Sequence, residues 1–160
     1  NNSTSIATTA YADTAAGSTL ALSGNVTTTS ASAGNITGLS FTAVSTSVYE
    51  IDGFYHTGCD NTGGIFFAIT LPAAGTTNIY YFGNSSNATS FLSTTNTASA
   101  TLTATAHNTQ NNNARGVFVK GTVTTAGTGG TVQFQFASAV AGQTSTIYKE
   151  GTWVNVKRIS

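Results

Sequence analysis

Charged side chains are the scarcest feature of this 160-residue sequence. Lys and Arg number five, Asp and Glu number five, and together they make up 6% of the chain, with a formal net charge of zero. Ordinary soluble domains carry about 25%. Five cations are too few for the basic patch that nucleic acids or anionic membranes require. We therefore expect no nucleic-acid partner, no membrane partner and no enzyme activity, because catalysis usually depends on clustered titratable groups.

Cysteine is nearly absent as well. The single cysteine, Cys59, has no second cysteine to pair with in these residues, so the disulfides that stabilise many small secreted domains are excluded here. No apolar run approaches the roughly 20 residues that a membrane-spanning helix needs. The packing of apolar side chains must therefore hold the fold together.

Small polar residues and aromatic residues are abundant instead. Disordered chains combine few aromatics with high net charge, whereas this chain has nine Phe, six Tyr and no net charge. Its many Thr residues suit a pleated sheet better than a flexible linker. A surface of hydroxyls and amides without net charge lacks the repulsion that keeps proteins apart. The composition therefore predicts a folded β protein that assembles as an obligate oligomer.

Apolar and polar residues alternate along much of the chain, which is the period of a half-buried strand. Glycine-rich turns separate the alternating segments, and no segment has a helical period. We expect an all-β antiparallel sandwich or barrel of about eight to ten short strands. The clearest strand candidates are 48–55, 65–71, 79–82, 100–106, 117–123, 131–136, 146–148 and 153–159.

Loops at one end of a sandwich are its natural contact sites. The polar loop candidates here are 58–64, 83–90 and 107–115. We expect the partner to contact one of them.

Three possible metal ligands, His56, Cys59 and Asp60, fall within five residues. Structural zinc generally takes four nitrogen or sulfur ligands in paired spacing, and only His107 remains to complete a set. We interpret the segment as a polar loop and predict no metal and no cofactor.

Two carboxylates, Glu50 and Asp52, are predicted to lie on the same face of one strand, about 7 Å apart. That spacing is close to the separation used by inverting glycosidases, but catalytic carboxylates normally come from separate elements that flank a cleft. No Gly-x-Ser-x-Gly nucleophile elbow is present either. We therefore interpret the pair as a solvated or interface-facing strand edge and predict no catalytic residues.

Exposed aromatic residues are possible stacking platforms for sugars or for partner surfaces. The candidates for ligand or receptor contact are Tyr80, Tyr81 and Trp153, and the alternative for each is ordinary core packing. The alternating row Thr101, Thr103 and Thr105 resembles the hydroxyl arrays of ice-binding proteins, but it is short enough to be the outward face of an ordinary strand.

The order of segments from residue 36 to residue 159 resembles a known family. It is similar to the small jelly-roll domains of tailed-bacteriophage virion proteins, whose topology is like that of tumour-necrosis-factor-like trimers. The segments that carry this resemblance are Thr-Gly-Leu-Ser-Phe at 37–41, Tyr-Glu-Ile-Asp at 49–52, Thr-Gly-Gly-Ile at 62–65, Leu-Pro-Ala at 71–73, Lys-Gly-Thr-Val at 120–123, Gly-Thr-Val-Gln-Phe-Gln-Phe-Ala at 130–137 and Lys-Glu-Gly-Thr-Trp-Val at 149–154.

The resemblance implies a jelly-roll domain over 36–160, preceded by an anchoring arm or added strands over 1–35. It also implies a homotrimeric knob on the virion surface that decorates a capsid or sits on a head or tail fibre, with the capsid or the fibre shaft as partner. Two alternatives remain open at this point. One is a carbohydrate- or receptor-binding module that recognises a host-surface glycan, and the other is an ice- or surface-binding protein.

Overall fold

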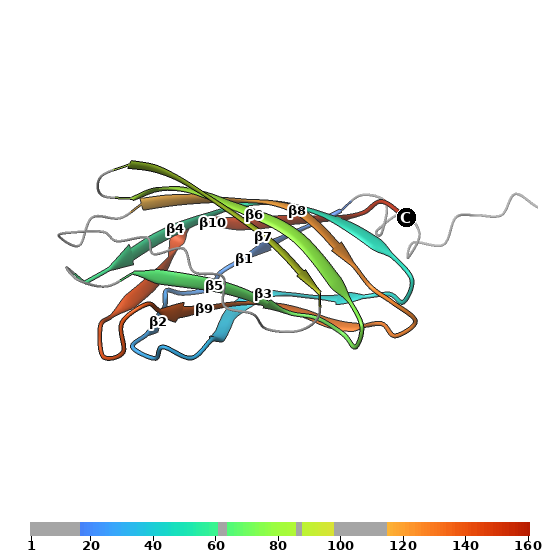
Figure 1. Ribbon diagram of the computed structural model, residues 1–160, viewed down its shortest axis with the longest axis horizontal. Helices are drawn as coiled ribbons and strands as arrows, with labels where there is room; N and C mark the ends of the chain where they lie inside the picture. Colours follow the sequence, from blue (N-terminus) through green and yellow to red (C-terminus); the bar gives the residue numbers. More distant parts are fainter. Residues whose placement is uncertain (1–16, 61–63, 86–87, 98–114) are drawn as a thin grey trace, which may run out of the picture.

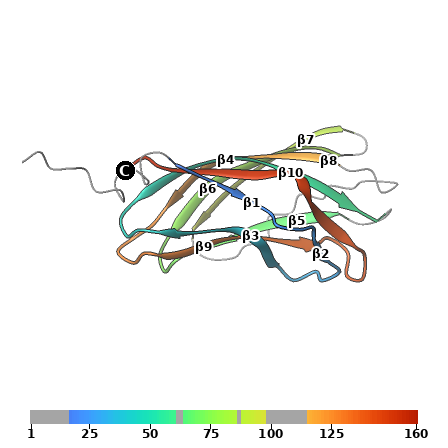
Figure 2. The ribbon, with the colours of Figure 1, turned by 180° about the vertical axis from the view of Figure 1, so that it is seen from behind.

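The computed structural model describes residues 17–60, 64–85, 88–97 and 115–160, and these residues form two facing antiparallel sheets (Figures 1 and 2). The described ranges contain ten strands and no helix, and therefore no helix able to span a membrane. The strands are β1 (Ser18–Ala21), β2 (Val26–Thr28), β3 (Gly34–Ala43), β4 (Val48–Cys59), β5 (Ile65–Thr70), β6 (Thr76–Ser85), β7 (Ala88–Thr97), β8 (Arg115–Thr124), β9 (Gly130–Ser138) and β10 (Ser145–Arg158). The predicted all-β sandwich is confirmed for this part of the chain.

The larger sheet has seven strands, in the order β1-β10-β4-β8-β6-β7, with β2 beside the first half of β10. The smaller sheet has the order β3-β9-β5 and forms the second layer. Residues 18–28 of the N-terminal region thus add β1 and β2 to the larger sheet along β10. The first 16 residues of the region 1–35, predicted as an anchoring arm or added strands, lie outside the described residues.

The core lies between the two sheets and follows the alternation of each strand. In β9, Val132, Phe134 and Phe136 are buried while Gln133 and Gln135 point away from the core, as the sequence predicts. Burying one such side chain contributes about 1.5–3 kcal/mol. The fold is therefore stabilised mainly by inward-facing aromatic and β-branched residues from both layers.

Three aromatic rings pack at the centre of this core. The Phe67 ring from β5 lies 5.3 Å from that of Tyr55 on β4 and 5.0 Å from that of Tyr81 on β6. Burial raises the pKa of the Tyr55 hydroxyl well above its ordinary value, with a smaller contribution from Tyr81, and burial also raises the pKa of Tyr81. Both side chains therefore stay neutral and connect the two layers.

A bulge interrupts β3 and changes which of its residues face inward. The β3–β9 register shifts between Asn35 and Ser40, and Gly38 has a positive φ of 96°. The Gln133 side-chain amide donates hydrogen bonds to the carbonyls of Ile36 (3.1 Å) and Leu39 (2.9 Å). Both residues are buried although they are three positions apart, which strict alternation would not allow.

The loop predicted at 83–90 is wrong and strand β7 was missed, and the polar loop predicted around His56 belongs to β4 as far as Cys59. The strand predicted at 79–82 extends over the whole of β6, and β7 pairs with it from Thr76↔Thr97 to Ser85↔Ala88. Segment 83–90 therefore contains paired strand residues, 83–85 opposite 88–90, instead of a long loop. Its Ser, Asn and Thr residues indicated a loop because β7 has too few apolar residues to show alternation. The strand predicted at 100–106 lies outside the described residues.

Candidate interaction surface

The outer face of the seven-stranded sheet carries an unusual row of aromatic residues. Pairing aligns Trp153 with Phe54, Phe54 with Phe118, and Phe118 with Phe82, so the row crosses β10, β4, β8 and β6. We call these four residues the aromatic row. Cross-strand partners point to the same face of an antiparallel pair. The row therefore forms a continuous apolar line across the middle of the sheet, on the side away from the core.

Packing fixes the side chains of the aromatic row. The Phe54 and Phe118 rings meet edge to face with centroids 5.1 Å apart, and the Phe54 ring also lies over Gly116, where an added Cβ would overlap it. Even so, Phe118 remains 58% exposed. A large apolar side chain held in solvent by its neighbours indicates a surface prepared for contact.

Two polar rows lie beside the aromatic row on the same face. The nearer one aligns Asn155, Asp52, Lys120 and Tyr80, and the next aligns Lys157, Glu50, Thr122 and Asn78. Glu50 and Asp52 thus share the outer face, as predicted. No ion pair involving these charged groups occurs among the described residues, which leaves them available to a partner or to water.

A shallow hollow opens between the two polar rows. It has a volume of about 380 Å³ and is lined by Glu50, Asn78, Tyr80, Lys120, Gly121, Thr122 and Ile159. Gly121 contributes only backbone to it, and an added Cβ there would overlap the carbonyl oxygen of Asn78 on the neighbouring strand. We call this feature the Gly121 hollow.

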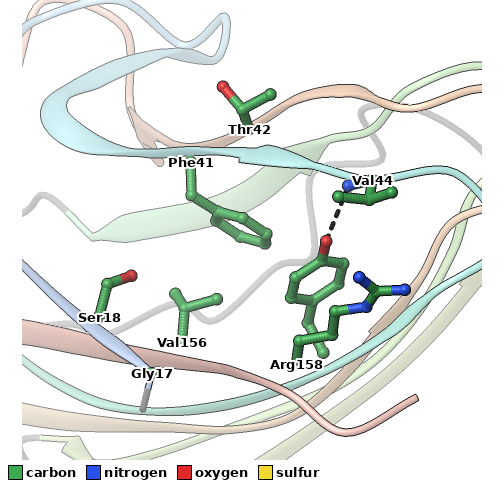
Figure 3. Close-up of a pocket in the computed structure, with 8 residues that line it drawn as sticks. Gly17, Ser18, Phe41, Thr42, Val44, Val156 and Arg158 are labelled. Atoms are coloured by element: carbon green, nitrogen blue, oxygen red, sulfur yellow. Dashed lines mark hydrogen bonds between the residues drawn. The ribbon is translucent and has the colours of Figure 1, made fainter. Parts of the chain in front are cut away.

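A second cavity, of about 240 Å³, lies where β3 approaches the ends of β1 and β10 (Figure 3). Figure 3 shows Phe41 and Arg158 facing this cavity from different layers. The Tyr49 ring lies 5.1 Å from that of Phe41, and its hydroxyl accepts a 2.7 Å hydrogen bond from the Val44 amide. Because internal bonds and contacts already engage these groups, the cavity is less open to a polar ligand than the outer face.

The three predicted contact residues occupy different environments. Tyr80 is 37% exposed on the outer face and Trp153, in the aromatic row, is half-buried. The prediction for Tyr81 needs correction: it is 2% exposed and packs against Phe67 in the core. Adjacent residues of a strand point to opposite faces, so Tyr80 and Tyr81 cannot both reach one ligand.

The most exposed residue of the aromatic row, Phe118, was missed by sequence reasoning, as was Phe54. The sequence did contain an indication of their exposure. Phe54 continues the two-residue period that places Glu50 and Asp52 on the solvent-exposed face of β4. Phe118 likewise alternates with the buried Val117 and Val119. Strand register, which the sequence does not reveal, is what brings the two rings together.

The three possible metal ligands do not converge. The His56 ring nitrogen Nδ1 lies 2.8 Å from the Glu150 carbonyl on the outer side, Cys59 is buried in the core, and Asp60 accepts a 2.9 Å hydrogen bond from the Thr144 amide. No group of three or more possible ligands occurs in the ranges that the structure describes. His107 and the row Thr101, Thr103 and Thr105 lie outside those ranges.

The bulge in β10 explains the position of His56. The β4–β10 register shifts between Tyr148 and Trp153, so four residues of β10 lie opposite one of β4. The Thr152 hydroxyl accepts a 3.0 Å hydrogen bond from the His56 amide, and the His56 ring packs 4.9 Å from that of Tyr148. These contacts give His56 a structural role at the bulge.

Comparisons with known proteins add little to these observations. No model of a known protein family matches the sequence, and no curated protein matches it. A weak similarity is found to a chain in the structure of infectious bursal disease virus, Gx strain, with a TM-score of 0.22 and 13% identity. The alignment covers 88% of this chain and 38% of the viral chain, so this chain spans little more than a third of the length of the viral chain. A TM-score of this size supports no conclusion about shared fold or function.

Proposed function

We propose that this chain is a non-enzymatic structural module on the surface of a bacteriophage virion, where it acts as a homotrimeric jelly-roll knob. Its role is attachment and stabilisation, through contacts with copies of itself and with a capsid or fibre shaft. The observation that carries the proposal is the aromatic row, because it presents a fixed apolar surface on a face whose neighbouring outward side chains are polar or charged.

The strand order supports a jelly roll. A jelly roll contains two Greek keys, formed as if a long antiparallel strip of strands were rolled up. Strands from the two ends of the sequence therefore pair with each other, and strands closer to the middle of the sequence pair inside them. Here β3 pairs with β9, β4 pairs with β8, and β6 pairs with β7, in nested order. Successive strands β3, β4, β5 and β6 also alternate between the two sheets. Both features fit the topology that the sequence resemblance implies.

The chemistry of the outer face supports self-association. Interface cores are enriched in Trp, Tyr and Phe and depleted in charge, and one buried aromatic anchor can contribute about 2 kcal/mol or more. The aromatic row supplies four such side chains in one line. The zero net charge of the chain adds no long-range repulsion between copies.

The virion assignment is supported by the resemblance of the segments between residues 36 and 159 to phage jelly-roll domains. The non-enzymatic assignment is supported by the placement of the titratable side chains on the described strands. Glu50 and Asp52 face outward on one strand, while His56 belongs to a bulge and Cys59 to the core. These groups do not form a nucleophile and base pair.

The interface is tested by Phe118→Ser, which removes the most exposed ring of the aromatic row without changing an inward-facing residue. We expect sedimentation velocity to show that this variant dissociates to monomers at concentrations where the unmodified chain is trimeric. The matched control is Val140→Ser, which removes a 44% exposed apolar side chain near the β9–β10 turn. An unchanged trimer in Phe118→Ser, or equal dissociation in the control, would contradict the proposed interface.

Placement on the virion is tested by labelled electron microscopy of purified particles. Regular copies over the capsid surface would identify a decoration protein, and copies at fibre ends would identify a knob. The absence of the protein from particles would overturn the virion assignment and leave the aromatic row as an interface of some other assembly.

A further inference from the structure

Beyond assembly, we propose that the Gly121 hollow binds a neutral pyranose sugar. The site has an exposed aromatic side chain as one wall and the backbone of the sheet as its floor. Several polar side chains around it form no hydrogen bond to another described residue. The inference rests on the outward side chains of β4, β6 and β8, and it does not depend on the proposed virion role.

The floor of the hollow is the backbone of β8 at Gly121. Gly121 pairs with Ile51 on one side and Ile79 on the other, and both of these side chains point into the core. The floor is therefore backbone. The volume of about 380 Å³ is near the lower end of the roughly 300–1,000 Å³ typical of small-molecule sites, which suits one or two sugar rings.

The wall and rim supply the two kinds of contact that a sugar needs. The Tyr80 ring, stacked 6.3 Å from Phe82, offers a flat surface for the apolar face of a pyranose. Around it, Glu50 accepts hydrogen bonds, Lys120 donates them, and Asn78 does both. A pyranose presents donors and acceptors around an apolar ring, which matches this arrangement.

These polar groups are free to bind a ligand. The side chains of Glu50, Asn78, Lys120 and Thr122 form no hydrogen bond or ion pair with any other residue in the described ranges. A ligand hydroxyl would therefore replace water without breaking an internal bond. Tyr80 is already oriented by its contact with Phe82, so little side-chain freedom is lost when it stacks.

Charge selects a neutral ligand. The Glu50 carboxylate and the Lys120 ammonium both line the hollow and cancel each other, and Asp52 pairs directly opposite Lys120. Because the two charged groups that line the hollow have opposite signs, they give neither an anion nor a cation a net attraction. An uncharged polyol, which binds through hydrogen bonds and stacking, needs no such attraction.

The hollow lies next to the aromatic row but is separate from it. Tyr80 is two residues from Phe82, and Lys120 is two residues from Phe118, a spacing of about 7 Å along a strand. A contact centred on the aromatic row would leave the hollow at its rim. Sugar binding and self-association are therefore separable by mutation.

The experiment titrates the full chain with a panel of methyl pyranosides at millimolar concentrations and records amide chemical shifts by nuclear magnetic resonance. We expect at least one sugar to give saturable shifts at residues of the hollow. Tyr80→Ala should weaken this binding by about tenfold, and Lys120→Gln, a conservative surface change, should also weaken it. The control Val44→Ala alters an exposed residue of the other cavity and should bind normally.

Three results would overturn the inference: no saturable shift with any pyranoside, unchanged binding in both hollow variants, or displacement of the sugar by inorganic phosphate. The titration is repeated with Phe118→Ser. Binding retained in that variant supports a site independent of assembly, and binding lost there would show that the hollow is completed by a second copy, contradicting the site as described.

Discussion

At the scale of single residues, the buried tyrosines Tyr49 and Tyr55 of β4 differ in whether the hydroxyl has a hydrogen-bond partner. The Tyr49 hydroxyl accepts a 2.7 Å hydrogen bond from the Val44 amide, whereas the buried Tyr55 hydroxyl finds no partner among the described residues. A buried hydroxyl without a partner costs about 1–3 kcal/mol. The pair therefore separates the effect of the hydroxyl from that of the ring.

We predict that Tyr55→Phe raises the free energy of unfolding by about 1 kcal/mol, because it removes the unpaired hydroxyl and keeps the ring on Phe67. The matched change Tyr49→Phe should lower it by a similar amount, because it leaves the Val44 amide without its partner. Urea denaturation followed by tryptophan fluorescence measures both. A loss of stability in Tyr55→Phe would mean that its hydroxyl is satisfied in solution.

The sequence predicted the environment of some residues and not of others, for reasons visible at this scale. Val132, Phe134 and Phe136 were correctly placed inside because every second residue of β9 is apolar. Tyr80 and Tyr81 were offered together because both are aromatic, and only the strand position separates an exposed ring from a buried one.

At the scale of elements, the β6–β8 pair depends on a glycine at position 121. An added Cβ there would overlap the Asn78 carbonyl oxygen and lie 2.8 Å from the Ile79 Cα, both backbone atoms that cannot move aside cheaply. This close approach also shapes the Gly121 hollow.

We predict that Gly121→Ala lowers the free energy of unfolding by about 3 kcal/mol, since the strands must separate locally to admit the methyl group. The control is Gly127→Ala, where an added Cβ meets no atom within 4 Å, and its effect should stay within about 0.5 kcal/mol. Thermal and urea unfolding of both variants give the comparison. Equal effects at the two positions would contradict the packing described for β6 and β8.

Element prediction succeeded where alternation is strong and failed where it is weak. β4, β8 and β9 show clear alternation and lie where the sequence placed them. β7, rich in Ser, Thr and Asn, was assigned to a loop because its polar residues hide the period. The bulges in β3 and β10 were not predicted either, since a local shift of register depends on partner strands far away in the sequence.

At the scale of the whole molecule, the outer face of the larger sheet combines few charged residues with the exposed aromatic row. Charged residues are few, and four of those on the larger sheet lie opposite a residue of the other sign on the neighbouring strand, in the pairs Asp52↔Lys120 and Glu50↔Lys157. Salt screens long-range forces between charges but has little effect on apolar contact. An assembly formed through the aromatic row should therefore be insensitive to ionic strength.

Whole-molecule prediction reached the fold class but not the surface. The sandwich followed from strand spacing and glycine-rich turns, and the tendency to assemble was inferred from composition. The aromatic row depends on the lateral order β10-β4-β8-β6, which brings together residues as distant in the sequence as Phe54 and Trp153. Local patterns contain no record of that order.

The most direct test of the central claim is sedimentation of the unmodified chain at micromolar concentration in low and in high salt. We predict a single species with three times the 16.2 kDa mass of the chain under both conditions. A persistent monomer, or a trimer that dissociates as salt is raised, would contradict an assembly built on the aromatic row.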